Sequence, residues 1–244
     1  MHQRILPTFS TLGAFLAYLE ERGELQAITA PVSMHLEITE LHRKVIAAGG
    51  PALRLAKPLD RDGHSARLPV VTNRFGTARR VAWGLGAEPE SLLDLGELLA
   101  WLRSPQLPQN MRYARRMLPA ARSIMQARPK MVSRPREWSG IDPDFASLPV
   151  QTCWPGDAGP LITWPVVVTR PPGKDDPGAY NLGIYRMQVI GRDRAIIRWL
   201  PMRGGAAHHR LWQASGAAMP VAVVIGADPA TLLAAGTPAP EGGS

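Results

Sequence analysis

Apolar residues at helical spacing alternate with short strand-like runs through the first part of the chain. A first helix is predicted between a cap at Ser10 or Thr11 and a stop at Gly23. Further helices are predicted over 36–48, 77–85 and 89–103, and short strands over 24–31, 53–55 and 69–72. Within the third predicted helix, Arg79 and Arg80 are expected to point outward. This alternation predicts an α+β domain.

The second part of the chain is rich in strand patterns and has few helices. Apolar runs predict a strand over 161–170, a hairpin with strands over 182–190 and 195–200, and a buried strand over 221–225. Helices are predicted over 206–217 and 228–235. A basic helix over 111–128 and a proline-rich linker over 130–149 separate the two parts. We therefore place a boundary near residue 140, with domains over 1–140 and 141–244.

The predicted hairpin carries the most distinctive polar residues. Strand side chains alternate between two faces, so one face holds Ile184, Arg186, Gln188 and Ile190, and the other Tyr185, Met187 and Val189. Arg198 lies on the second strand, and Arg203-Gly204-Gly205 follows it. Arginine binds phosphate and carboxylate with two parallel hydrogen bonds, and glycine lets backbone N–H groups approach a ligand closely. The pattern therefore predicts an anion site, with Arg186 and Arg198 brought into one cleft by strand pairing.

The net charge of +8 is concentrated in one segment. No acid occurs between Glu97 and Glu137, whereas residues 112–136 contain 8 basic side chains. Such a segment could contact nucleic acid, anionic lipid or a phosphorylated ligand, but a solvated helical face is the commoner meaning. Tyr113 is its one aromatic residue, which leaves little surface for stacking bases. We expect no nucleic-acid partner, and peripheral membrane association stays open.

The composition, 45% hydrophobic and 20% charged, is typical of a globular protein. No apolar run approaches the roughly 20 residues that span a bilayer, and the first residues lack the apolar core of a signal peptide. The single cysteine, Cys153, excludes an internal disulfide and is expected to be a structural thiol. These features favour the cytoplasm.

Several other polar residues have two possible meanings. Asn181 follows a loop and opens a strand. It is either a turn residue that bonds its own backbone or an oxygen ligand of a hard metal. Adjacent residues on a helix point in different directions, so His208 and His209 are not expected to chelate a metal together. Aspartates in proline-rich loops are expected to cap turns: Asp142, Asp144, Asp175 and Asp176.

Several motifs follow one another in a single order along nearly the whole chain. They are Gly23-Glu24-Leu25, Leu36-Glu37-Ile38-Thr39-Glu40, Gly49-Gly50-Pro51-Ala52-Leu53, Gly76-Thr77-Ala78-Arg79-Arg80, Thr152-Cys153-Trp154-Pro155, Pro160-Leu161-Ile162-Thr163-Trp164 and Gly226-Ala227-Asp228-Pro229-Ala230. With residues 181–205, they make the sequence resemble the UbiD family of decarboxylases. That family uses prenylated flavin mononucleotide (FMN) to remove CO2 from aromatic or unsaturated acids. The resemblance is weakest across 104–138.

The resemblance implies that an N-terminal α+β domain precedes the first part of a flavin-reductase-like split β-barrel. It implies that Arg186 is the catalytic arginine that holds the substrate carboxylate. It also implies that Asn181 binds a divalent metal, usually Mn2+, beside the flavin phosphate, with K+ as a further ion. Relatives with histidine at the position of Arg198 use it for the metal, whereas this chain follows the arginine subgroup of the ubiquinone-pathway branch. The implied cofactor contacts are Ile184, Tyr185, Arg186, Arg198, Trp199, Leu200, Arg203 and Gly204.

The resemblance further implies a substrate like 4-hydroxy-3-polyprenylbenzoate, a flavin prenyltransferase as cofactor supplier, and a homo-oligomeric full-length protein. The family's second metal-binding glutamate and its catalytic acid would follow Ser244. We therefore expect a carboxy-lyase whose isolated chain is inactive. The alternative is a non-catalytic cofactor-binding or assembly subunit that needs a partner chain for the catalytic glutamates.

Overall fold

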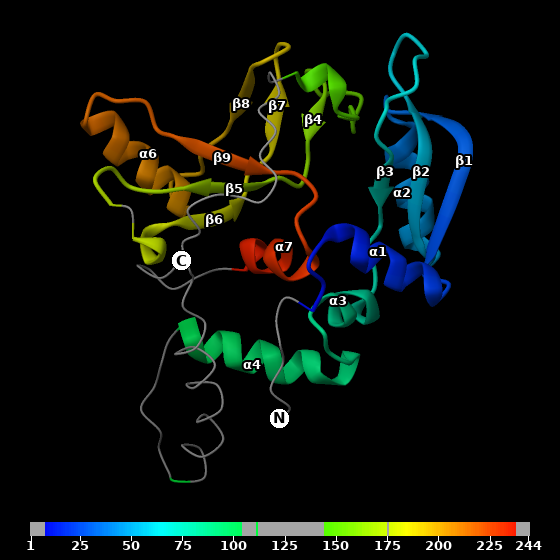
Figure 1. The fold of residues 1–244 in the computed structure, drawn as a ribbon, viewed down its shortest axis with the longest axis horizontal. Helices are drawn as coiled ribbons and strands as arrows, with labels where there is room; N and C mark the ends of the chain where they lie inside the picture. Colours follow the sequence, from blue (N-terminus) through cyan, green and yellow to red (C-terminus); the bar gives the residue numbers. More distant parts are fainter. Residues whose placement is uncertain (1–7, 104–110, 112–143, 175, 238–244) are drawn as a thin grey trace.

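The computed structural model describes residues 8–103, 111, 144–174 and 176–237 (Figure 1). The N-terminal part consists of α1 (Leu12–Glu21), β1 (Leu25–Ser33), α2 (Glu37–Ala47), β2 (Ala52–Leu59), β3 (Val70–Thr72), α3 (Ala78–Gly84), η1 (Pro89–Ser91) and α4 (Leu92–Arg103). Its three-stranded sheet has the order β1-β2-β3. β1 and β2 are parallel with α2 between them in sequence, and β3 is antiparallel to β2. This confirms the predicted mixture of helices and short strands.

Two apolar clusters hold this N-terminal layer together. One forms where α2 packs on the sheet through Ile38, Leu53 and Leu55. The other gathers Phe15 and Leu19 of α1, whose N-terminus is capped by Thr11 as predicted. Burial of these side chains supplies the main favourable term for folding. The layer is therefore a packed unit that can support a site at its surface.

Arg80 corrects one of the expectations from sequence. Arg79 is exposed, but the side chain of Arg80 is fully buried, at 0% exposure. Its Nη1 donates a 2.7 Å hydrogen bond to Glu24, which also pairs with Arg79. The partner lies 56 positions earlier in the chain. Helical spacing cannot reveal a partner so distant in sequence. Arg80 was expected to point outward because an arginine without an ionic partner is costly to bury.

The C-terminal part contains more strands than helices, as predicted. Its elements are η2 (Phe145–Ser147), β4 (Leu161–Ile162), β5 (Val166–Thr169), η3 (Pro177–Ala179), β6 (Asn181–Ile184), β7 (Met187–Val189), β8 (Ala195–Ile197), α6 (Gly204–Ala214), β9 (Val221–Val224) and α7 (Pro229–Gly236). They form two three-stranded sheets, β4-β7-β8 and β6-β5-β9. The flavin-reductase-like barrel stays a prediction.

Two predicted strands are each broken between these sheets. The run 161–170 divides at Pro165 into β4 and β5, and the run 182–190 divides at Tyr185-Arg186 into β6 and β7. Each half pairs in a different sheet. Proline has no N–H to donate to a ladder, which accounts for the first break. Each of these two segments therefore contributes one strand to each sheet.

β9 was predicted to be a buried strand, and this is wrong. It pairs with β5 alone and lies at the edge of its sheet, and all its residues are exposed. The predicted burial rested on its continuous apolar run, Val221 to Ile225. Such a run does not tell whether a strand lies at the centre or at the edge of a sheet.

Backbone hydrogen bonds join the N-terminal and C-terminal parts. Thr152 donates its N–H to Met34 at 3.0 Å and accepts the N–H of Leu36 at 2.9 Å. His35 and Thr152 form an isolated parallel bridge. Figure 1 shows that α7 of the C-terminal part lies beside α1 of the N-terminal part. The two parts are therefore placed relative to each other by main-chain contacts.

Several expectations lie outside the described residues: the basic segment 112–136, the boundary near residue 140, Asp142 and Asp175. Asp144 and Asp176 do cap turns, accepting the N–H groups of Ala146 and Gly178. No helix in the described part of the chain is both long and apolar enough to cross a membrane.

Candidate functional site

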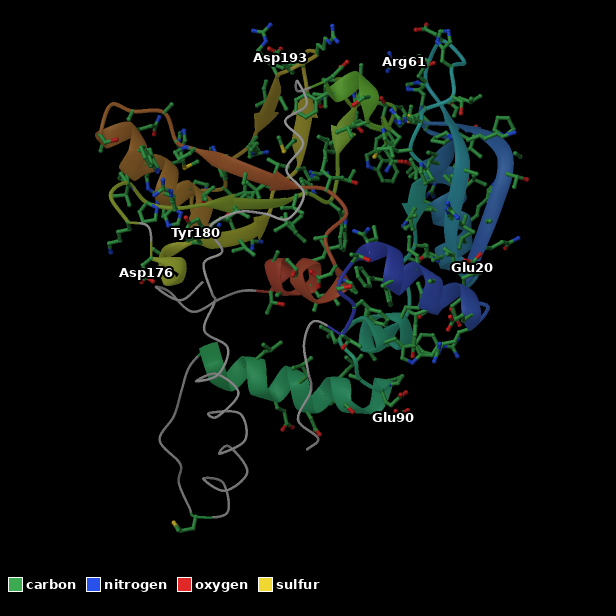
Figure 2. The ribbon with its side chains drawn as sticks, viewed as in Figure 1. Glu20, Arg61, Glu90, Asp176, Tyr180 and Asp193 are labelled. Carbon is green, nitrogen blue, oxygen red and sulfur yellow. The ribbon has the colours of Figure 1, made fainter. Side chains whose placement is uncertain are left out.

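The predicted turn and hairpin are present as β7 and β8. Met187 pairs with Ile197 and Val189 with Ala195. Figure 2 shows Asp193 at the tip of the turn, far from the base of the strands. The rings of Tyr185 and Trp199 lie 4.9 Å apart, so facing contacts continue two positions past the last registered pair. Arg186 and Arg198, the sequence neighbours of these two rings, are both exposed, but Arg186 lines the cavity described below and Arg198 does not.

Tyr185 is turned inward by the break between β6 and β7. Its side chain is buried among Ile162, Val167 and Met187. A Cβ on Gly183 would come within 2.5 Å of the tyrosine ring, so only glycine leaves room for the ring here. The phenol oxygen accepts the N–H of Gly205 at 2.9 Å. Tyr185 therefore joins the strand break to the first turn of α6.

The N-terminus of α6 is open to an approaching ligand. Arg203 is its N-cap residue, and its side chain makes no capping hydrogen bond. A Cβ on Gly204 would lie 2.2 Å from Oδ1 of Asn181, so the absence of a side chain lets this amide approach the helix start. The amide Nδ2 of Asn181 faces the hydroxyl of Tyr185 at 3.5 Å. The N–H groups of Gly205 and Ala206 already donate to Tyr185 and to the carbonyl of Arg203, so the N–H of Gly204 and the helix dipole are what this terminus offers to a phosphate.

The two histidines of α6 point in different directions, as predicted. Nδ1 of His208 lies 3.0 Å from the hydroxyl of the buried Thr169. The ring of His209 stacks near Trp199, with centroids 6.0 Å apart. Burial lowers the pKa of His208 below its usual value. They fix α6 against the sheet and the hairpin rather than chelating together.

The remaining predicted site residues lie in three places: at the surface, beside α7 and in a cavity. Arg198, Leu200 and Arg203 are exposed beside the hairpin and the helix start. Ile184 packs against the cluster of Val166 and Leu232, next to α7. It therefore does not share the surroundings of Asn181. Arg186 is exposed and lines a separate cavity.

This cavity has a volume of about 700 Å³ and lies between the two parts of the chain. Its walls come from α2, β3 and the residues after it on one side, and from β4 and its flanking residues on the other. Arg74 and Gln151 line it and were not singled out from the sequence. Cys153 lines it too, and burial raises the pKa of its thiol, which is consistent with the predicted structural role. Only the tertiary arrangement brings these residues together.

The metal-binding groups in the described residues are limited. Asn181 offers one amide oxygen, which suits a hard cation. Asp60, Asp62 and His64 form the one cluster of acids and histidine with ligand atoms close enough to share an ion, among described residues. It lies in the exposed loop whose tip Figure 2 marks with Arg61, and Asp60 accepts the N–H groups of Asp62 and His64.

Comparison with known families accounts for both parts of the chain. The N-terminal domain of 3-octaprenyl-4-hydroxybenzoate carboxy-lyase matches residues 16–99, and the Rift-related domain of the same enzyme matches residues 125–244. The chain belongs to the UbiD family. The motifs up to Arg80 lie in the first match, and those from Thr152 onward lie in the second. The second match also contains Asn181, Arg203 and Gly204 at the start of α6, which we call the β6–α6 site.

Solved UbiD-class structures have the same fold. The enzyme HmfF from Pelotomaculum thermopropionicum, in complex with prFMN, is 25% identical, with a TM-score of 0.66 over 93% of this chain and 46% of its own. Vanillic acid decarboxylase from Sedimentibacter hydroxybenzoicus is 25% identical, with a TM-score of 0.70 over 99% of this chain and 47% of its own. The 3,4-dihydroxybenzoic acid decarboxylase AroY from Klebsiella pneumoniae is 19% identical, with a TM-score of 0.63 over 91% and 43%, which shows the fold alone. The chain spans about half the length of these relatives.

The β6–α6 site fits a flavin phosphate with its metal. Gly204 is exposed, and Arg203 stands at the helix start. Asn181 presents its oxygen toward the same turn. For the metal, Asn181 supplies one oxygen donor, and further ligands would have to come from the phosphate and from other residues.

Proposed function

We propose that this chain is the cofactor-binding part of a decarboxylase that acts on an aromatic or α,β-unsaturated carboxylic acid with prenylated FMN. The observation that carries the proposal is the open start of α6, where Asn181, Arg203 and Gly204 converge. Membership of the UbiD family and the HmfF complex with prFMN support the same reaction class. The finer proposal for the substrate is an acid resembling 4-hydroxy-3-polyprenylbenzoate.

Each residue of the site has a proposed task. The N–H of Gly204 and the side chain of Arg203 bind the flavin phosphate, and Asn181 provides an oxygen ligand to Mn2+ beside it, with K+ as a further ion. Trp199, Leu200 and Arg198 border the flavin from the hairpin. Arg186 binds the substrate carboxylate before CO2 leaves. When bound, the prenylated flavin supplies the electron sink that decarboxylation requires.

Flavin binding with a matched pair of glycine variants tests the proposal. Gly204→Ala places a methyl group 2.2 Å from Oδ1 of Asn181, whereas Gly191→Ala meets nothing closer than 3.7 Å. FMN with Mn2+ is titrated while flavin fluorescence is followed. Gly204→Ala is expected to weaken FMN affinity at least about tenfold, which corresponds to about 1.4 kcal/mol, and Gly191→Ala to leave it unchanged. Equal affinity in the two variants would contradict the site.

The alternative function is a cofactor-binding or assembly subunit that works with a partner chain. It is favoured by the β6–α6 site, in which Asn181 is the one proposed metal ligand, so further ligands would have to come from elsewhere. We expect this chain, produced together with a flavin prenyltransferase, to bind flavin but to release no CO2 from 4-hydroxybenzoate-type acids. Adding the second half of a UbiD-family protein in trans would restore turnover under the alternative. Turnover by this chain alone would assign the acid role to a residue within it.

A further inference from the structure

The cavity between the two parts of the chain contains a cation that lacks an ionic partner. Arg74 follows β3 and lines the cavity, and its guanidinium lies 5.5 Å from the ring centre of Phe75 and 5.6 Å from that of Trp164. No carboxylate pairs with Arg74 anywhere in the described part of the chain. Burial lowers the pKa of Arg74 to about 10, so the side chain remains charged at neutral pH. A half-buried charge without an ionic partner is costly, so an anion entering the cavity would be favoured.

The rest of the cavity wall indicates what kind of anion would fit. Apolar side chains dominate it, including Ile38 and Ile46 from α2 and Leu161, Ile162 and Trp164 from the β4 region. The side-chain oxygen of Gln151 is buried with no hydrogen-bond partner among the described residues. A volume of about 700 Å³ lies within the range of about 300–1,000 Å³ that small-molecule sites have. A ligand therefore needs an apolar body and an anionic end, and a hydroxyl or N–H would satisfy Gln151.

We propose that this cavity binds an organic acid, with an apolar body against α2 and β4 and its carboxylate against Arg74. The cavity does not include the start of α6, but Arg186 lines it, so the inference rests on the role proposed for Arg186 and adds Arg74 as a further cation for the carboxylate. The proposal rests on the cavity and not on the cofactor. Arg186 at the wall gives the acid a second cation to approach when the proposed decarboxylase binds substrate.

Tryptophan fluorescence provides a direct measurement, because Trp164 touches both Arg74 and the cavity. The whole chain without flavin is titrated with benzoate, with its uncharged isostere benzamide, and with inorganic phosphate. We expect saturable quenching by benzoate, affinity for benzamide at least about tenfold weaker, and no competition by phosphate. Equal binding of benzoate and benzamide, or displacement of benzoate by phosphate, would overturn the proposal. All three titrations use the unaltered chain.

Matched arginine variants locate the anion. Arg74→Gln is expected to weaken benzoate binding at least about tenfold while leaving FMN affinity unchanged. Arg22→Gln is the control, because Arg22 also stacks on aromatic rings, 3.5 Å from the centre of Tyr18, but does not line the cavity. Retention of benzoate affinity in Arg74→Gln with its loss in Arg186→Gln would place the acid on Arg186 and overturn this inference alone. The FMN affinity of Gly204→Ala tests the proposed function, and it does not depend on the benzoate affinities of Arg74→Gln and Arg186→Gln.

Discussion

Tyr185 shows how a single side chain can hold the candidate flavin site in shape. The resemblance to UbiD enzymes predicted it as a flavin contact, but its ring is buried in the core and its hydroxyl accepts the N–H of Gly205. The same hydroxyl lies beside the amide of Asn181. Tyr185 is thus a positioning residue for the start of α6, because it reaches the site through these two partners.

Tyr185→Phe isolates that hydrogen bond, since the ring stays and only the oxygen is removed. The N–H of Gly205 would be left buried without a partner, which costs about 1–3 kcal/mol. We expect the free energy of unfolding, measured in urea, to fall by about that amount, and Mn2+–FMN affinity to weaken. Tyr180→Phe is the control, because Tyr180 makes no hydrogen bond through its hydroxyl among the described contacts. Equal losses in both variants would contradict the positioning role.

Glu24 and Arg80 give a second prediction at this scale. Arg80 is fully buried, and Glu24, at 14% exposure, provides its ionic partner. Glu24→Gln leaves a buried cation without a carboxylate, so the free energy of unfolding should fall by about 3–5 kcal/mol. Glu40→Gln breaks only exposed pairs with Arg43 and Lys44, and should cost less than about 1 kcal/mol. Chemical denaturation of both variants measures the difference, and similar losses would show that the buried pair contributes nothing special.

At the scale of elements, sequence patterns predicted the hairpin, its facing residues and the helices well. Alternation placed Tyr185 and Met187 on the buried face and Arg186 on the exposed one. Alternation could not predict that the strand is interrupted at Tyr185-Arg186, so that β6 and β7 belong to different sheets. Sheet membership depends on long-range pairing, such as Thr169 with Asn181 in one sheet and Ile162 with Met187 in the other. For the same reason the pattern of Val221 to Val224 could not show that β9 is an edge strand.

The contact of α6 with β5 is expected to make the free energy of unfolding depend on pH. His208 meets the hydroxyl of Thr169 there, and burial lowers its pKa in the folded state. The unfolded chain, with a pKa of about 6.5, therefore takes up a proton first as pH falls. The free energy of unfolding should be unaffected by this group above about pH 7 and should decrease as pH falls below about 6.5.

His208→Gln keeps a hydrogen-bonding side chain and removes the titration. Urea unfolding at a series of pH values should show a smaller decrease in acid for this variant than for the unaltered chain. His64→Gln is the control, because His64 lies on the exposed loop and its ring is 80% exposed. If the acid loss is the same in all three proteins, other groups cause it.

At the scale of the whole molecule, family membership followed from the motif order. The cavity did not, because its walls come from residues as distant as Ile38, Arg74 and Trp164. No spacing rule connects such positions before the two parts are docked. The docking itself depends on main-chain bonds at Thr152 and on a few ring contacts, which a sequence pattern does not specify.

Those few contacts predict that the two parts unfold together. Trp164 bridges them, with its ring 6.1 Å from that of Phe75, and main-chain hydrogen bonds at Thr152 reinforce the junction. Trp164→Ala should therefore lower the protection of amides in both β2 and β5 by a similar free energy, about 1–3 kcal/mol. Trp154→Ala is the control, since Trp154 is exposed to 50%, close to the 45% of Trp164, but makes no ring contact among the described residues. Native-state hydrogen exchange measures both strands in one experiment. If only β5 loses protection in Trp164→Ala, the N-terminal sheet unfolds on its own and the junction does not couple the two parts.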